Sequence, residues 1–306
     1  MRFIETIIWI YRLIRESIEQ FIQDRVFNFS AALAYYTIFS IGPVMIIVIS
    51  LVGFFYEDRS IQTEMFVHIK EMLGEEAAVQ IENLIDNISL SDEKTFSFFL
   101  GLGFLLFGAT RAFVQIQESI NQIWSIRATP KYGILKALID RLLSFSLLIT
   151  MSFILLVSLF INAIINIFQN ELSSLFPELA VPIVQLSNLL FTFSIISFIF
   201  FIIFKVLPDA IVHWKDAMVG AIVTAVLFML GNAGIGYYLA TGDLMSVYGA
   251  AGSLIVILVW VYYSATILYF GAEFTQVYSI KCGRNIRPSS KAVSIKKVEQ
   301  EKNDLK

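Results

Sequence analysis

Long apolar stretches alternate with short polar segments along most of the chain. Six of these stretches contain 20 to 27 residues each, and a hydrocarbon core roughly 30 Å thick needs about 20 helical residues to cross it. They cover about residues 31–56, 96–115, 142–168, 183–207, 217–239 and 247–272. The pattern therefore predicts an all-α integral membrane protein, in which residues 1–280 form one polytopic domain built as a bundle of six transmembrane helices.

The N-terminal residues show a different periodicity, that of an amphipathic helix over residues 3–22. Apolar residues recur at steps of three and four, and charged residues lie on the opposite side. The apolar set is Ile4, Ile7, Ile8, Tyr11, Ile14, Ile18 and Phe21, and the charged set is Arg12, Arg15, Glu16 and Glu19. Because every turn carries charge, we expect this helix to lie in the membrane interface and not to span the bilayer. A cytosolic helix packed on the bundle is the alternative.

Two polar segments lie outside the predicted spans. Residues 57–95 contain ten acidic and three basic residues. Two apolar stripes at helical spacing flank Gly74 there, and they predict a short extracytoplasmic segment of two amphipathic helices on the outer face of the bundle. Residues 281–306 are rich in charge and predict a disordered cytoplasmic tail.

Composition and charge agree with a membrane protein. Apolar residues make up 57% of the chain and charged residues 15%, whereas about 25% is usual for soluble domains. Of the 22 lysines and arginines, only 3 fall in the odd-numbered connections between spans. Because cytoplasmic segments are enriched in Lys and Arg, this bias predicts that both termini are cytoplasmic. The net charge of −3 offers no basic surface, so we expect the lipid bilayer, and no nucleic acid, as a partner.

Charged residues within or beside a span are candidate functional residues, because charge is unfavourable in hydrocarbon. Arg111 lies about fifteen residues into the second predicted span, and Glu118 follows on the same helical side. One hypothesis is that both residues, with Asp216 or Glu273, line a polar vestibule at the cytoplasmic mouth of a transport path. The alternative is that Arg111 is a snorkelling anchor whose head group reaches water at the helix end.

Small residues in the last two predicted spans indicate close helix contacts. Asn232 lies among three glycines, where its amide either holds two helices together or lines a cavity at a break in the helix. Gly249 and Ser253 have the spacing of a small-xxx-small pair, which favours helix packing.

The sequence contains no familiar catalytic or cofactor motif. No HExxH, GxSxG, P-loop or GxGxxG pattern occurs, and Cys282 is the single cysteine, which excludes a cysteine-based metal cage. His68 and His213 are predicted on opposite sides of the membrane. Asp209 and Asp216 flank His213 and are compatible with a cation site, but a solvated loop with local ion pairs is the favoured interpretation. We therefore expect no enzyme activity, no cofactor and no metal.

Four stretches of the chain carry more specific patterns. They are FSAALAYYTIFSIGPVMIIVISLVG at 29–53, FGATRAFVQIQESINQIW at 107–124, LPDAIVHWKDAMVGAIVTAVLFMLGN at 207–232 and YGAAGSLIVILVWVYYSATILYFGAEF at 248–274. These stretches resemble the YihY or BrkB family of bacterial inner-membrane proteins. The LPD and WxDA pair and the YGAAGS and GAEF elements are the most specific parts of the resemblance.

The resemblance implies a six-helix protein of the bacterial inner membrane with a role in transport, envelope lipid handling or resistance. The residues that match the family's motifs are Tyr35, Pro43, Asp209, Asp216, Tyr248, Gly249, Gly252, Ser253 and Glu273. Arg111 stands where the resemblance predicts a small or uncharged residue. The family's former label, ribonuclease BN, implies RNA cleavage, but the sequence shows neither a basic groove nor an acid, base or metal pair for it.

The leading hypothesis is a transport or permeability role for a lipid or small solute, without nucleotide hydrolysis. A membrane scaffold that docks an envelope protein is the alternative, supported by the acidic segment 57–95 and the charged tail. A second copy of the chain is a further candidate partner. A membrane-associated ribonuclease has the least support.

Overall fold

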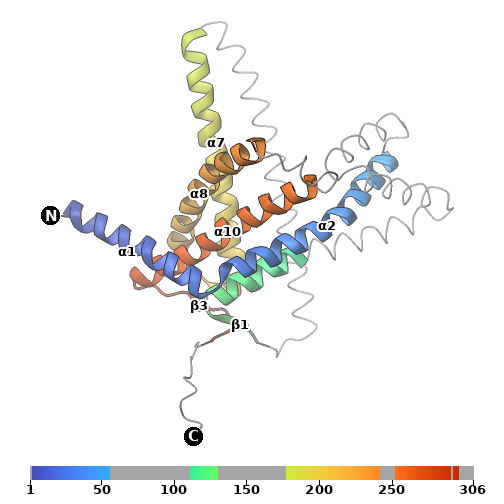
Figure 1. Ribbon diagram of the computed structural model, residues 1–306. Coiled ribbons are helices and arrows are strands. Elements are labelled where there is room, and N and C mark those ends of the chain that lie inside the picture. Colours follow the sequence, from blue (N-terminus) through green and yellow to red (C-terminus); the bar gives the residue numbers. More distant parts are fainter. Residues whose placement is uncertain (1, 56–110, 130–176, 242–251, 291, 296–306) are drawn as a thin grey trace. The chain divides into compact units, whose positions relative to one another are not determined.

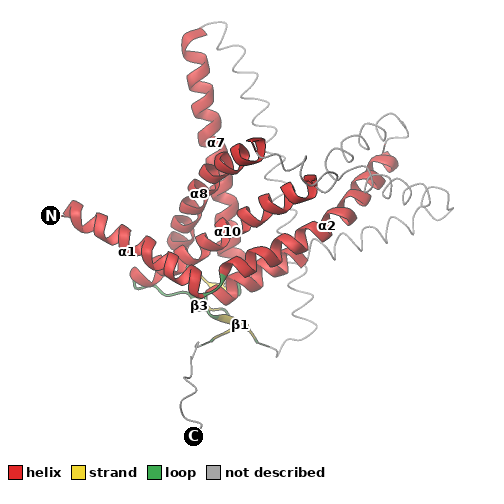
Figure 2. Cartoon of the chain, viewed as in Figure 1, coloured by secondary structure: helices red, strands yellow, loops and turns green. Residues whose placement is uncertain are grey.

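Helices form almost all of the described part of the protein, as Figure 1 and Figure 2 show. The computed structural model describes residues 2–55, 111–129, 177–241, 252–290 and 292–295. Its helices are α1 (Arg2–Gln23), α2 (Val26–Phe55), a helix over residues 111–123, α7 (Pro177–Val206), α8 (Trp214–Thr241) and α10 (Gly252–Lys281). The predominantly helical fold expected from the sequence is confirmed.

Three helices of the described residues are long and apolar enough to cross a membrane. They are Gln185–Val206, Trp214–Gly236 and Leu254–Lys281, and they correspond to the fourth, fifth and sixth predicted spans. The first predicted span lies in α2, which also contains Pro43. The third predicted span, most of the second and the segment 57–95 lie outside the described residues, so the number of six spans stays a prediction.

The chain forms two compact units. The first contains Met1–Val26, Gln117–Leu227 and Leu268–Lys306, and the second contains Phe27–Ile116 and Phe228–Ile267. Both α8 and α10 therefore contribute residues to each unit. Most of the buried polar contacts described below belong to the first unit.

Within the first unit, α8 and α10 pack closely through two reciprocal contacts. A Cβ atom added at Gly220 would lie 1.9 Å from Oγ1 of Thr275 on the other helix, and one added at Gly271 would lie 1.9 Å from Oγ1 of Thr224. Thr224 donates its hydroxyl to the carbonyl of Gly220 at 2.7 Å. Thr275 donates likewise to Gly271 at 2.6 Å. Each helix thus carries a Gly-xxx-Thr pair, and the missing glycine side chains allow the two backbones to approach.

Helix α1 has three faces. Leu13, Ser17 and Phe21 are buried, and Leu13 packs with Phe274 and Val277 of α10. Charged residues occupy a second face. The third face is apolar and between 44% and 64% exposed, and it consists of Ile7, Tyr11, Ile14, Ile18 and Ile22. The amphipathic helix predicted near the N-terminus is therefore present, and its location in the membrane interface stays a prediction.

The C-terminal end of α10 is closed by a glycine motif. Gly283 has a φ of 69°, its N–H donates to the Ile280 carbonyl at 2.9 Å, and the Arg284 N–H donates to the Ser279 carbonyl at 3.0 Å. These two bonds define a Schellman motif, which needs a residue in the left-handed conformation and therefore favours glycine.

Beyond α10 the structure differs from the disordered tail predicted for 281–306. Strand β3 (Arg287–Pro288) pairs antiparallel with β2 (Ala210–Ile211), and β4 (Ala292–Ser294) pairs antiparallel with β1 (Ile126–Ala128). The partners lie far away in the sequence, so local composition gave no signal for these strands. Residues 296–306 lie outside the described residues.

Candidate functional site

A buried carboxylate, Asp216, lies in the first turn of α8. The helix begins where the backbone N–H groups of Asp216 and Ala217 donate to the carbonyl of His213, at 3.0 and 3.1 Å. An acidic side chain is favourable at this position because the free N–H groups of a helix start carry partial positive charge. The Asp216 side chain is 0% exposed, which corrects the prediction of a solvated loop.

Two residues from the end of α10 and the segment after it hold this carboxylate. Ser279 donates its hydroxyl to Oδ2 of Asp216 at 3.0 Å, and Nη2 of Arg284 lies 2.7 Å from Oδ1. The Schellman motif at Gly283 places Arg284 directly after the turn. The helix end and the ion pair are therefore built by one local structure.

The charge of Arg284 balances that of the buried carboxylate. Partial burial lowers the pKa of the guanidinium, but the charge of Asp216, its hydrogen bond and the smaller effects of Cys282 and Tyr278 together outweigh this, so that the pKa of Arg284 is raised above its ordinary value. Arg284 therefore stays protonated and Asp216 keeps a cationic partner. A buried carboxylate needs such a partner, because the desolvation of an isolated charge is strongly unfavourable.

A second carboxylate, Glu273, is also 0% exposed and lies on α10 in the same unit. Beside it, the indole N–H of Trp124 donates to the carbonyl of Ala272 at 3.0 Å. Tyr269, one turn earlier on α10, is fully buried too. The helix over residues 111–123 and the turn after it are thus anchored to α10 next to Glu273.

Asp209 forms a reciprocal pair with Asn121. The amide Nδ2 of Asn121 donates to Oδ2 of Asp209 at 3.0 Å, and the backbone N–H of Asp209 donates to Oδ1 of Asn121 at 2.9 Å. The carbonyl of Asp209 accepts a bond from the N–H of Ser289 at 2.9 Å. Three of the four stretches that carry the family resemblance, 107–124, 207–232 and 248–274, are therefore joined by direct contacts in the first unit.

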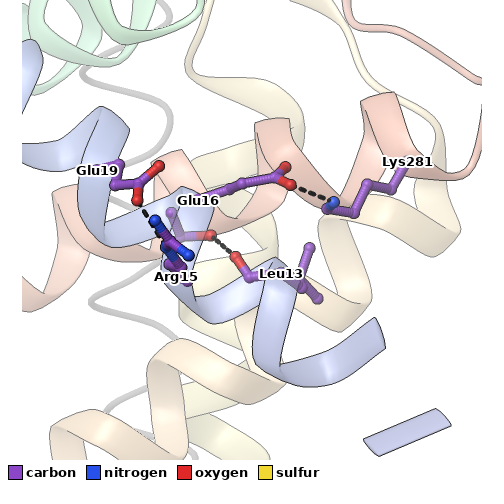
Figure 3. A network of polar contacts seen from close by, with 6 residues as sticks. Leu13, Arg15, Glu16, Glu19 and Lys281 are labelled. Atoms are coloured by element: carbon purple, nitrogen blue, oxygen red, sulfur yellow. Dashed lines mark hydrogen bonds and ion pairs between the residues drawn. The ribbon is translucent and has the colours of Figure 1, made fainter. Parts of the chain in front are cut away.

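Two ion pairs on α1 lie close to this region (Figure 3). Nζ of Lys281, at the end of α10, is 2.7 Å from Oε1 of Glu16, and Nε of Arg15 is 2.8 Å from Oε1 of Glu19. The hydrogen bond and the charge of Glu19 raise the pKa of Arg15. The charged face of α1 is thus tied to the same helix end that carries Ser279.

The other candidate residues take different positions. Glu118 is exposed in the first unit, whereas Arg111 is exposed in the second. In that second unit Asn232 accepts a hydrogen bond from the indole of Trp260 at 3.4 Å, and Tyr35 is 57% exposed. The polar vestibule predicted from Arg111, Glu118 and the two buried acids therefore stays a prediction.

Several predicted positions have no described side chain. Tyr248 and Gly249 lie outside the described residues, Gly252 begins α10, and the side chains of Ser253 and Pro43 are likewise not described. Among the residues that the structure describes, no group of three or more His, Cys, Asp or Glu side chains is arranged to hold a metal ion.

Sequence analysis missed three contributors to this site, Asn121, Ser279 and Arg284. Arg284 was assigned to a disordered tail together with the charges that follow it. Gly283 could have given the signal, because a glycine just after a long helix often marks a C-terminal cap and ordered chain beyond it. Nothing local identifies Asn121, whose partner is 88 residues away.

The sequence matches the family described as Virulence factor BrkB over residues 17–296. The chain belongs to the BrkB family. Because the match covers most of the chain, it includes the buried carboxylates and the C-terminal strands as well as the helices. The resemblance proposed from the four sequence stretches is thereby confirmed.

Relatives of this BrkB-family protein are named as membrane proteins. A "UPF0761 membrane protein" of Tolumonas auensis is 28% identical over 264 residues, which cover 82% of this chain and 80% of the relative. One of Aeromonas salmonicida is 26% identical, with 84% and 85% covered. One of Pseudomonas aeruginosa is 27% identical, and there the match spans 83% of this chain but only 59% of the relative. No solved structure matches. This BrkB-family chain is therefore a membrane protein, and the names of these three relatives state no enzyme activity.

Proposed function

We propose that this protein has a transport or permeability role in the bacterial cytoplasmic membrane and moves a small solute or lipid without hydrolysing nucleotide. The observation that supports the proposal is the pair of fully buried carboxylates, Asp216 and Glu273, within two helices long enough to span a membrane. Ionisable residues in such helices are unfavourable unless they are paired, and they commonly mark transport paths.

The partners of Asp216 suggest how such a path is controlled. Its carboxylate is held by a hydroxyl from α10 and a guanidinium that follows α10. An ion pair that joins two helix ends can exist in a closed and an open state, and a solute or proton that competes for the carboxylate would shift the balance between them. In this proposal the site lies at the cytoplasmic end of the bundle, as the charge bias of the sequence predicts.

Reconstitution tests the proposal. Purified protein is inserted into phospholipid vesicles, and the movement of a fluorescent phospholipid, of small ions and of neutral solutes is followed against empty vesicles. Asp216→Asn and Glu273→Gln remove the charges with little change in shape, and we expect each to slow the transported probe roughly tenfold, the effect of losing about 1.4 kcal/mol.

Glu5→Gln is the matched control, because this acid lies in the same unit but is exposed. It should transport at the wild-type rate. Folding of each variant is checked by its elution as a single species in detergent. If the wild-type protein moves none of the probes faster than empty vesicles do, the transport proposal fails. The scaffold alternative rests chiefly on residues 57–95, which lie outside the described residues, and it stays a prediction.

A further inference from the structure

An apolar groove separates α1 from α8 and α10 in the first unit. Its volume is about 530 Å³, within the range of roughly 300–1,000 Å³ that is common for ligand sites. Ile14 and Ile18 of α1, Val219 and Val223 of α8, and Phe270 and Phe274 of α10 are among the residues that line it. None of these side chains can form a hydrogen bond, so the groove suits a hydrocarbon ligand.

The groove continues into the exposed apolar face of α1. Ile14 and Ile18 line the groove and are also 44% and 45% exposed as part of that face. With α1 in the membrane interface, as the sequence predicts, this face lies against lipid. A ligand can therefore enter from the lipid side without crossing a polar barrier.

The depth of the groove fits one leaflet of a bilayer. Along α10 it extends from Phe270 to Tyr278, which is about 12 Å at 1.5 Å per residue. Half of the hydrocarbon core measures about 15 Å. Trp9 and Tyr278 line the groove where α10 nears its end, and their rings meet edge to face at 6.0 Å. Aromatic residues of these two types are typical of the boundary between hydrocarbon and headgroups.

Charged groups lie beside the groove, and Figure 3 shows the ion pairs that they form. Arg15 and Glu16 directly follow the lining residue Ile14, and Lys281 lies three residues beyond Tyr278. Lys281 is therefore near the headgroup level that Trp9 and Tyr278 indicate. Both cations already pair with carboxylates, Lys281 with Glu16 and Arg15 with Glu19, so this region is polar and carries both signs of charge. A phospholipid combines an acyl chain that suits the groove with a charged headgroup that suits such a surface.

We propose that the groove between α1, α8 and α10 binds one acyl chain of a membrane phospholipid, with its headgroup beside the ion pair of Glu16 and Lys281. The site is independent of the proposed transport role, because a bound lipid would be found whether or not the protein moves a solute. In this proposal α1 forms one wall of a lipid-binding site in addition to lying against the membrane surface.

Native mass spectrometry of detergent-extracted protein tests the site. The wild-type protein should retain one phospholipid of the host membrane per chain. Val223→Trp places an indole in the groove, where it takes the space of several methylene groups of the acyl chain. The lipid occupancy should therefore fall at least about tenfold. Ile222→Trp is the matched control, because Ile222 is the neighbouring residue, 40% exposed and not part of the lining, and it should retain the lipid.

A second measurement does not depend on the folding of Val223→Trp. A phosphatidylethanolamine with brominated acyl chains is titrated into wild-type protein and Trp9→Phe in detergent, and the difference between them isolates the quenching of Trp9 fluorescence. Quenching that saturates near one lipid per chain supports the site. Quenching that only rises in proportion to the lipid content of the micelle would overturn the proposal. So would mass spectra in which the wild-type protein, as a monomer or as a dimer, retains no lipid.

Discussion

The contact between α8 and α10 makes Gly271→Ala a sensitive test of the packing. The added methyl group would lie 1.9 Å from Oγ1 of Thr224 and 2.9 Å from its Cβ and Cγ2 atoms, so the helices must separate by about an ångström to restore ordinary contact. Rotating Thr224 offers little relief, because a β-branched side chain has few favourable rotamers in a helix and its hydroxyl is bonded to the Gly220 carbonyl.

We expect Gly271→Ala to lower the free energy of unfolding by about 1–3 kcal/mol, the usual effect of one methyl group too many in a packed interior. Thermal unfolding in detergent, followed by the fraction of protein that elutes as a monodisperse peak, measures the change. The double variant Gly271→Ala with Thr224→Gly removes the obstructing side chain and should recover most of the loss. Gly234→Ala is the control, since nothing lies within 4 Å of a Cβ added there. The packing argument is refuted if Gly271→Ala unfolds at the wild-type temperature, or if the second substitution gives no recovery.

Three further results are expected. Asn121→Ala removes both bonds to Asp209 and should destabilise the protein by about 1–3 kcal/mol, measured by the same thermal assay, whereas an unchanged unfolding temperature would mean that water replaces the amide at no cost. Gly283→Ala should cost about 1 kcal/mol through its positive φ alone, because nothing crowds a Cβ there, and Gly283→Asn should cost less; equal values would contradict the conformational explanation. A membrane-impermeant maleimide should label the exposed Cys282 in inside-out vesicles but not in intact spheroplasts, with Cys282→Ser as the blank, and the opposite pattern would reverse the predicted topology.

Hydropathy predicted the existence of the helices better than their ends. The sixth predicted span stopped at residue 272, before Glu273, because a charge usually indicates water. In the structure α10 continues to Lys281, and Glu273, Thr275 and Ser279 are buried inside the first unit. Likewise α8 begins three residues before the predicted start at 217, where the His213 carbonyl accepts the first bonds of the helix. Hydropathy registers neither the burial of Asp216 and Glu273 within the protein nor the hydrogen bonds that begin α8.

The candidate site was only partly accessible to sequence reasoning. Asp216 and Glu273 could be selected because a charge in an apolar stretch is rare and local. Their surroundings could not, since Ser279 is 63 residues from Asp216 and such pairings depend on how helices are placed together. The amphipathic pattern of α1, in contrast, could be predicted from the sequence, because the residues of one helix face recur every three or four positions.

The strands after α10 also determine the order in which the protein can mature. Strands β1 and β2 are synthesised long before their partners, because β2 pairs with residues 287–288 and β1 with residues 292–294. The ion pair between Arg284 and Asp216 likewise cannot form until the segment after α10 has been synthesised. A chain that ended at Lys281 would contain every described helix but would lack Arg284, β3 and β4, so these contacts can form only after all of the described helices have been made.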